Sequence, residues 1–164
     1  MKKITYLIVS IILLNLIYAC AGYKPIFSTN IQFEIANYSI KSNKKLGKQI
    51  YSKLYSLTKS NKKNTDTQSI DIIIDVTKNK TPTVKSSTGK ILEYRILVTS
   101  NIIIKDYLTD DKILSQNFSY SSVYKVQDQY SETITLENKT INNLINKTYE
   151  NLLIKLSESI STKW

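Results

Sequence analysis

The chain has 164 residues, no histidine and a single cysteine, Cys20. This composition excludes the usual zinc and haem sites and the Cys/His and Ser/His/Asp catalytic sets, and its three scattered glycines form neither a phosphate-binding loop nor a dinucleotide fingerprint. The formal net charge of +10 at pH 7 favours anionic partners such as lipid head groups, phosphorylated glycolipid or nucleic acid.

The first nineteen residues are typical of a secretory signal peptide. Lys2 and Lys3 give a basic start, residues 4–19 are apolar at all but three positions, and a small residue precedes Cys20. A membrane-spanning helix needs about 20 apolar residues, so this segment is too short to be a permanent anchor. We therefore expect cleavage after residue 19. Export of the mature chain removes most of the case for nucleic acid as a partner.

The residues around the expected cleavage site resemble a lipobox. In Ile17-Tyr18-Ala19-Cys20 an aliphatic residue stands third before the cut, a small residue stands immediately before it, and cysteine follows. Two or three acyl chains on Cys20 would anchor the protein stably, because each buried CH₂ contributes about 0.8 kcal/mol. The alternative is a chance cysteine in a hydrophobic leader. We predict that Cys20 is lipidated.

The mature chain begins with a tether and a β-α pair. Residues 20–30, with Gly22 and Pro25, are predicted to be a short lipidated tether. Alternating apolar residues predict a strand over 31–36, and residues 37–43 are predicted to be a polar connection. An amphipathic helix is expected from Lys44 to about Lys59, with Ser42 or Asn43 as its N-cap. Its apolar positions are Leu46, Ile50, Leu54 and Leu57.

The centre of the chain alternates with a period of two residues. It predicts strands over 70–77, 92–105 and 114–126, joined by a lysine-rich loop over 78–90 and a turn over 106–112. Such consecutive strands should form an antiparallel meander. From Ser131 onward, apolar residues at a period of 3.6 predict a long final helix.

This order, β-α-β-β-β-α, predicts an α+β fold in which residues 31–164 form a single domain. We expect a two-layer sandwich of a four-stranded mixed sheet with both helices on one face. The opposite face would be half-polar, and it would be either solvated or a docking surface. Leu97, Ile103 and Val123 on that face favour docking.

Carboxylate pairs are the only remaining basis for an enzyme. Asp71 and Asp75 share one face of a predicted strand, and Asp110 and Asp111 lie in a predicted turn. A hydrolase would need two such acids directed into a pocket, whereas both pairs are more simply interpreted as solvated polar positions. We expect no catalytic residues, no metal site and no cofactor.

The residues of the tether resemble those of a known family. The lipobox followed by Cys-x-Gly-Tyr-x-Pro (Cys20, Gly22, Tyr23, Pro25) resembles the opening of the LptE-type lipopolysaccharide-assembly lipoproteins, particularly alphaproteobacterial ones. The similarity extends along the mature chain through the order of elements, a Ser-x-x-Gly hairpin before a strand carrying Arg95, and an Asp-rich turn. The terminal helix departs from the pattern, because Asn, Thr and Lys replace much of the usual Ala.

The resemblance implies a non-enzymatic lipoprotein on the periplasmic face of the outer membrane. It would partner an outer-membrane β-barrel translocon and help to deliver lipopolysaccharide, which the family binds through basic residues near the central hairpin. The matching residues are Lys78, Lys80, Lys85, Lys90 and Arg95. The lysines could instead be an ordinary solvated hairpin, and Arg95 could form a cross-strand ion pair with Asp71 or Asp75. An auxiliary lipoprotein of an ABC-type lipid transporter is the alternative function.

Overall fold

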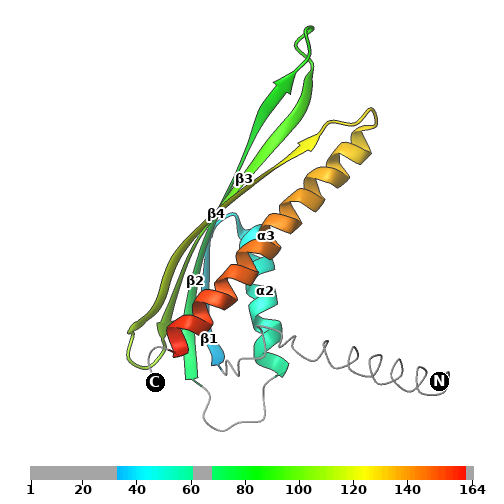
Figure 1. Ribbon diagram of the computed structural model, residues 1–164. Coiled ribbons are helices and arrows are strands. Elements are labelled where there is room, and N and C mark those ends of the chain that lie inside the picture. Colours follow the sequence, from blue (N-terminus) through cyan, green and yellow to red (C-terminus); the bar gives the residue numbers. More distant parts are fainter. Residues whose placement is uncertain (1–32, 61–67, 162–164) are drawn as a thin grey trace, which may run out of the picture. The chain divides into compact units, whose positions relative to one another are not determined.

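The structure is a computed structural model that describes residues 33–60 and 68–161 (Figure 1). They belong to one compact unit, Ile31–Trp164. The predicted leader, Cys20 and the tether lie outside the described residues. The elements are β1 Phe33–Ser42, α2 Lys44–Ser60, β2 Gln68–Lys85, β3 Ile91–Asp106, β4 Lys112–Lys125 and α3 Tyr130–Ser161. The predicted α+β class and its β-α-β-β-β-α order are confirmed.

The sheet has the strand order β1-β2-β3-β4 and is mixed. β1 runs parallel to β2, because α2 carries the chain back across the sheet between them. β2, β3 and β4 follow one another as the predicted antiparallel meander. The expected four-stranded mixed sheet is therefore observed.

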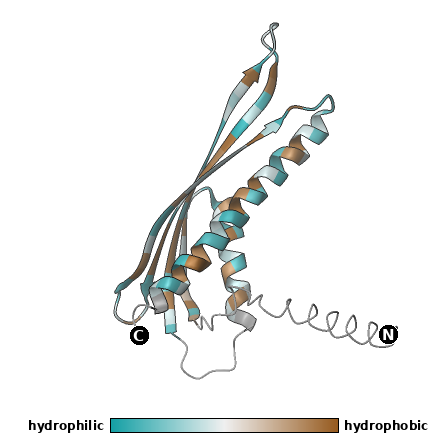
Figure 2. Cartoon of the chain, viewed as in Figure 1, coloured by the Kyte–Doolittle hydropathy of each residue, from teal (hydrophilic) through white to brown (hydrophobic). Residues whose placement is uncertain are grey.

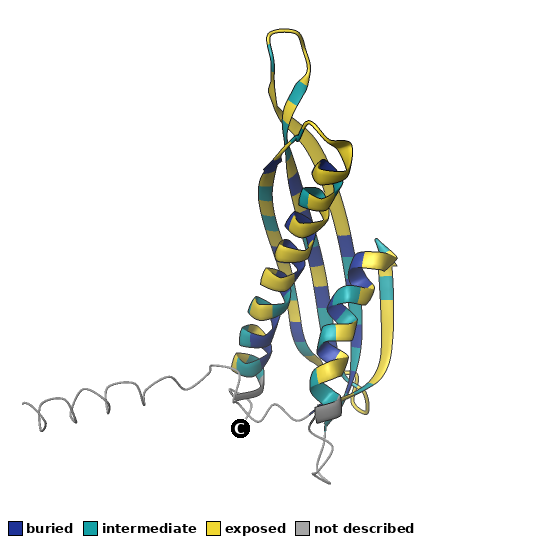
Figure 3. Cartoon of the chain, turned by 90° about the vertical axis from the view of Figure 1, so that its right-hand side faces the viewer, coloured by how far each residue is buried: buried dark blue, intermediate teal, exposed yellow. Residues whose placement is uncertain are grey.

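One face of the sheet carries the core, and both helices cover it. α2 packs on β1 and β2, α3 packs on β4 and β3, and the two helices touch each other. The buried sides of both helices are turned to the strands in Figure 3, and apolar bands alternate with polar ones along the strands in Figure 2. The fully buried large side chains include Ile50, Leu54, Ile72, Ile74, Ile96, Ile102, Ile145 and Leu152.

The first strand is longer than the sequence predicts. Residues 37–42, expected to be a polar connection, continue β1 and pair with β2 as far as Val76. A register shift between Ile35 and Asn37 marks a bulge at Ala36. A shift of one residue moves the inward-facing set from Phe33 and Ile35 to Tyr38 and Ile40. The period-two pattern is therefore broken in the sequence although the strand continues.

The second strand also extends beyond its predicted end. Residues 78–85, expected to be a loop, pair with β3 through Lys85. Pro82 is tolerated because β1 ends opposite Val76, so this half of β2 is a sheet edge, and because the register shifts between Pro82 and Val84. Only Ser86–Lys90 form the turn, with Gly89 at a φ of 84°.

The start of α2 has the predicted cap and an unexpectedly close contact. Asn43 is the N-cap, because its Oδ1 accepts a hydrogen bond from the Leu46 amide at 3.1 Å. Gly47 is buried against Ile40, where an added Cβ would collide with the Ile40 Cγ2. None of the helices in the described ranges has the length and apolar character that crossing a membrane requires.

Candidate functional site

The candidate binding residues lie on or near a hairpin that projects beyond the start of α3 (Figure 1). It consists of the outer half of β2, residues 77–85, the turn, and the beginning of β3. All the residues from Thr77 to Lys85 are exposed. The Ser86 amide donates to the Lys90 carbonyl at 2.8 Å, and the Gly89 amide donates to the Ser86 carbonyl at 3.0 Å, which closes the turn. The outer part of the hairpin is thus an extended arm, whereas its base lies beside α3.

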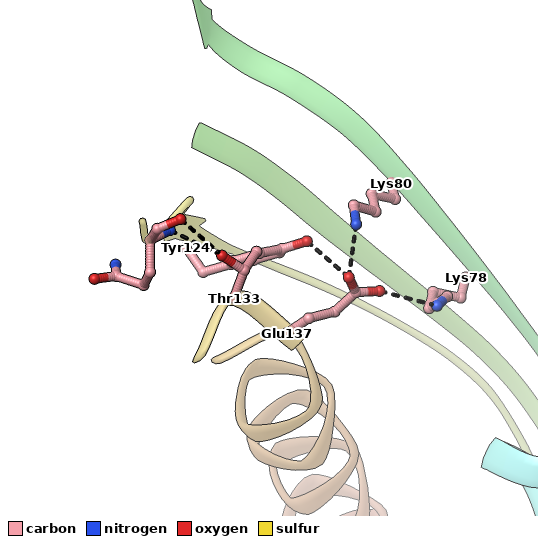
Figure 4. Close-up of polar contacts among 6 residues, drawn as sticks. Lys78, Lys80, Tyr124, Thr133 and Glu137 are labelled. Carbon is pink, nitrogen blue, oxygen red and sulfur yellow. Dashed lines mark hydrogen bonds and ion pairs between the residues drawn. The ribbon is translucent and has the colours of Figure 1, made fainter. Parts of the chain in front are cut away.

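The base of this arm is fastened to α3 through one carboxylate. The Lys80 ammonium lies 2.6 Å from Glu137 Oε2, the Tyr124 hydroxyl donates to the same oxygen at 2.8 Å, and the Lys78 ammonium lies 3.5 Å from Oε1 (Figure 4). Lys80 also lies over the ring of Tyr94, with 4.2 Å between its Nζ and the ring centroid. We call Lys78, Lys80, Tyr94, Tyr124 and Glu137 the base cluster.

The electrostatics of the base cluster favour its charged form. Burial by itself would raise the pKa of Glu137, but the hydrogen bonds from Lys80 and Tyr124 outweigh it and hold that pKa below its ordinary value. Burial would lower the pKa of Lys80, and the carboxylate again outweighs it, so the net shift of that pKa is upward. The Glu137 side chain is only 13% exposed. Because a charge-assisted hydrogen bond contributes about 1.5–3 kcal/mol, the cluster is a structural fastening.

The five candidate residues do not form one cluster. Lys78 and Lys80 project from the helix-facing side of β2 and are occupied by Glu137. Arg95 projects from the opposite face of the sheet, in register with Thr81 on β2 and Val123 on β4. Lys85 and Lys90 flank the turn at the tip. The inferred basic patch is therefore divided between two faces and the end of the arm.

The side chains of Lys85, Lys90 and Arg95 have no ion pair with any residue in the described ranges. In particular, Arg95 does not form the alternative ion pair considered for it. In register, Asp71 lies opposite Lys105 and Asp75 lies opposite Asn101, six or more positions along β3 from Arg95. Lys85 and Lys90 beside the turn, and Arg95 on the opposite face near the base of the arm, are consequently available to an anionic ligand.

Glu137 is the residue at this site that sequence reasoning missed. It falls on the apolar stripe of the last helix, three residues after Ile134 and four before Ile141. A carboxylate on such a stripe is a signal of a buried polar partner, because a carboxylate is almost never buried without one. Lys78 and Lys80 continue the inward-facing positions of β2 after Val76, which would have identified that partner.

A cleft of about 260 Å³ adjoins the base cluster between the beginnings of the two helices. Its floor is apolar, from Leu46 and Ile141, and Gln49 contributes a side-chain oxygen that is buried without a hydrogen-bond partner. The remaining wall consists of amides and charged groups from Asn43, Lys45, Lys78, Glu137, Asn138 and Asn142. Within the described residues no group of three or more Asp, Glu, Cys or His side chains could hold a metal ion.

The face of the sheet opposite the helices is polar with a few apolar positions. Leu97 is 39% and Val123 46% exposed, and Ile103 lies in register with Ile73 further along the same face. Thr99 and Ser119 share a hydrogen bond at 3.2 Å between these apolar positions. The half-polar character expected of this face is therefore present, and its use for docking stays a prediction.

The fold is shared with solved structures, several of which are named as lipoproteins. A candidate lipoprotein from Caulobacter crescentus has a TM-score of 0.56 and 10% identity over 79% of this chain and 92% of its own. A minor lipoprotein from Acinetobacter baumannii has a TM-score of 0.55 and 11% identity over 77% and 92%. Lipoprotein B from Nitrosomonas europaea, described as uncharacterized, has a TM-score of 0.55 and 14% identity over 80% and 86%.

At these identities the likeness shows a shared fold. None of the three structures is named as an enzyme. No protein-family model and no curated protein matches the sequence.

Proposed function

We propose that this chain is a lipoprotein of the outer membrane, anchored at the periplasmic face through Cys20, that partners a β-barrel in lipopolysaccharide transport. The observation that carries the proposal is the fold, which matches solved lipoproteins over most of both chains. The leader, the lipobox and the Cys-x-Gly-Tyr-x-Pro tether support it independently, because none of them was needed to find the fold.

The projecting hairpin is the part of the domain that would contact the glycolipid. Lipid A phosphates require cations that are free to approach them, and Lys85, Lys90 and Arg95 have no competing carboxylate. Lys78 and Lys80 would contribute indirectly, by holding the arm on α3 through Glu137. The turn, exposed on both sides, lets an acyl-chain-bearing ligand approach without entering the core.

Two measurements test this proposal in order. Radiolabelled palmitate should be incorporated by the full-length chain in a Gram-negative host and should be absent from Cys20→Ser. The wild-type protein, solubilised in mild detergent and captured by a C-terminal tag, should then retain a large outer-membrane β-barrel. Recovery of a permease or a periplasmic lipid carrier in place of the barrel would support the ABC-type alternative, and lack of labelling would refute the anchor.

A further inference from the structure

The positive charge of this protein is concentrated in one segment. Residues 35–63 contain eight lysines and no Asp or Glu. Residues 64–164 contain twelve basic and twelve acidic residues, so this larger part of the chain is formally neutral. The excess charge of the chain therefore corresponds to the end of β1, α2 and the residues after α2, because acidic residues elsewhere in 64–164 offset the cations of the projecting hairpin.

α2 places part of this charge beside exposed aromatic rings. Lys44, Lys48, Tyr51 and Tyr55 are spaced by four, three and four residues, which aligns them on one side of the helix. Tyr51 stacks on Tyr55 with 5.7 Å between ring centroids, and on Tyr38 of β1 with 4.0 Å. We call these five residues the tyrosine–lysine stripe.

The stripe lies at the solvent-exposed edge of the helix layer, where Tyr51 alone is half-buried and packs against the core. Tyr38 is 52% and Tyr55 40% exposed, and both lysines are exposed. The buried side of the same helix is the different set Leu46, Ile50 and Leu54. α2 lies along the half of the sheet that is away from the tip of the hairpin (Figure 1), so the two surfaces are separate.

The stripe is poorly explained by stability. Lysines at the start of a helix oppose the macrodipole, which costs about 0.3–1 kcal/mol for each charge at low salt. Lys44, Lys45 and Lys48 all lie in the first turns of α2, no acidic residue balances them there, and none of the three has an ion pair in the described ranges. The exposed rings of Tyr38 and Tyr55 add apolar surface to the same place. A local arrangement that opposes stability at an exposed position is expected at a binding surface.

We propose that the tyrosine–lysine stripe docks the domain on an anionic phospholipid surface. Each lysine close to such a surface contributes about 1 kcal/mol, and tyrosine rings settle at the boundary between head groups and acyl chains. Lysines carry their charge on long apolar stems, so the rings and the stems can occupy the same depth.

The inference rests on the proposed function in one respect, because the lipid on Cys20 would hold the domain near the membrane. Phe33 lies thirteen positions after Cys20, and a fully extended chain of that length reaches about 45 Å. Contacts that are too weak to recruit a free protein become effective at the high local concentration that a tether provides.

The test uses the full-length lipidated protein in vesicles of phosphatidylcholine, with or without about 30% phosphatidylglycerol, a composition that gives a surface potential able to attract lysine. A membrane-impermeant amine reagent labels the outward-facing protein, and mass spectrometry measures the rate at each lysine. On the anionic vesicles Lys44 and Lys48 should react at least about threefold more slowly, and about 0.5 M salt should restore the rate because it screens the charges. Lys112, Lys125 and Lys139, exposed elsewhere, are internal controls.

Two variants sharpen the result. On anionic vesicles the amides of wild-type α2 should exchange more slowly than on neutral ones, and Lys44→Gln/Lys48→Gln should remove this protection. The same variant should slightly raise stability, because it removes the charge–dipole conflict. Lys112→Gln/Lys139→Gln changes the net charge equally and should leave that protection unchanged. Equal labelling on both vesicles, or a general slowing that includes the control lysines, would overturn the proposal.

Two further outcomes distinguish phospholipid binding by the stripe from membrane attachment through the acyl anchor and from binding of lipopolysaccharide. Flotation of the protein with neutral vesicles reports the acyl anchor alone, so failure there would count against the proposed function and not against the stripe. Protection of Lys44 and Lys48 only on vesicles that contain lipopolysaccharide would assign the stripe to glycolipid and refute a phospholipid surface.

Discussion

Lys80 of β2 and Glu137 of α3 are 57 residues apart in the chain and 2.6 Å apart in space. The same carboxylate oxygen accepts the hydroxyl of Tyr124, and the ammonium lies over the ring of Tyr94. One acidic side chain thus ties the projecting arm of the sheet to the last helix. The β2 strand of the arm has no other neighbour than β3, because β1 ends opposite Val76.

Replacement of Glu137 by Gln should loosen the arm. It leaves two ammonium groups beside a neutral amide, so we expect a loss of about 1–3 kcal/mol in the free energy of unfolding, measured by urea denaturation. Amide exchange should accelerate more in residues 78–85 than in residues 70–76, which lie in the core. Uniform acceleration across β2, or unchanged stability, would show that the base cluster does not fasten the arm. Glu158→Gln, at an exposed pair with Lys155, is the matched control.

The same carboxylate should give the domain an acid-sensitive part of its stability. The pKa of Glu137 is lower in the folded protein than its ordinary value of 4.5, so its contribution is complete above that value and is lost as pH falls through the folded pKa. Wild type should therefore lose more unfolding free energy than Glu137→Gln as pH falls below about 4.5. Asp106 has a lowered pKa as well, through hydrogen bonds from Gln68 and from backbone amides, but both proteins share it. Parallel curves in the two proteins would contradict the assignment.

Local pattern predicted most of this fold, and its failures have one physical origin. Apolar residues recur with a period of two in the strands at 92–105 and 114–126 and with a period of about 3.6 in both helices. They do so because one face of each element is buried against a partner. The missed segments, 37–42 and 78–85, are sheet edges with a bulge or a proline, where backbone pairing maintains the strand without a continuous buried face. A periodic pattern of apolar residues reports a buried face, and residues 37–42 and 78–85 form strands in which few side chains are buried.

The candidate site was less predictable, because residues that are close in sequence can lie on opposite faces of a sheet. Lys80 and Arg95 lie on paired strands, but alternate side chains point to opposite faces of a sheet, and these two do so. Lys80 forms an ion pair with Glu137 of α3, and this contact depends on how the helix packs on β4 and β3. A count of basic residues near the hairpin could not distinguish occupied cations from free ones.

Gly47 should resist replacement although it lies inside a helix. Alanine would gain about 1 kcal/mol of helix propensity, but its Cβ would collide with the Cγ2 of Ile40, whose branched side chain cannot turn away easily. We expect Gly47→Ala to destabilise the protein by about 1–3 kcal/mol, as overpacking does. Ser52→Ala, on the exposed side of α2, should be neutral or slightly stabilising. In an Ile40→Ala background the penalty of Gly47→Ala should largely disappear, and a persistent penalty would refute the steric explanation.

The cations of the hairpin should divide into two groups with opposite phenotypes. The triple variant Lys85→Gln/Lys90→Gln/Arg95→Gln removes three charges that have no carboxylate partner in the described ranges. Binding of purified lipopolysaccharide by the full-length protein should therefore weaken at least about tenfold and become less sensitive to salt. Its stability to urea should be unchanged, because no ion pair is lost. Lys80→Gln should lower stability, because it leaves the carboxylate of Glu137 without its closest cation. A triple replacement of Lys112, Lys125 and Lys139 by Gln matches the change in charge and should leave binding unaffected. If that control weakened binding equally, net charge and not the hairpin would govern recognition.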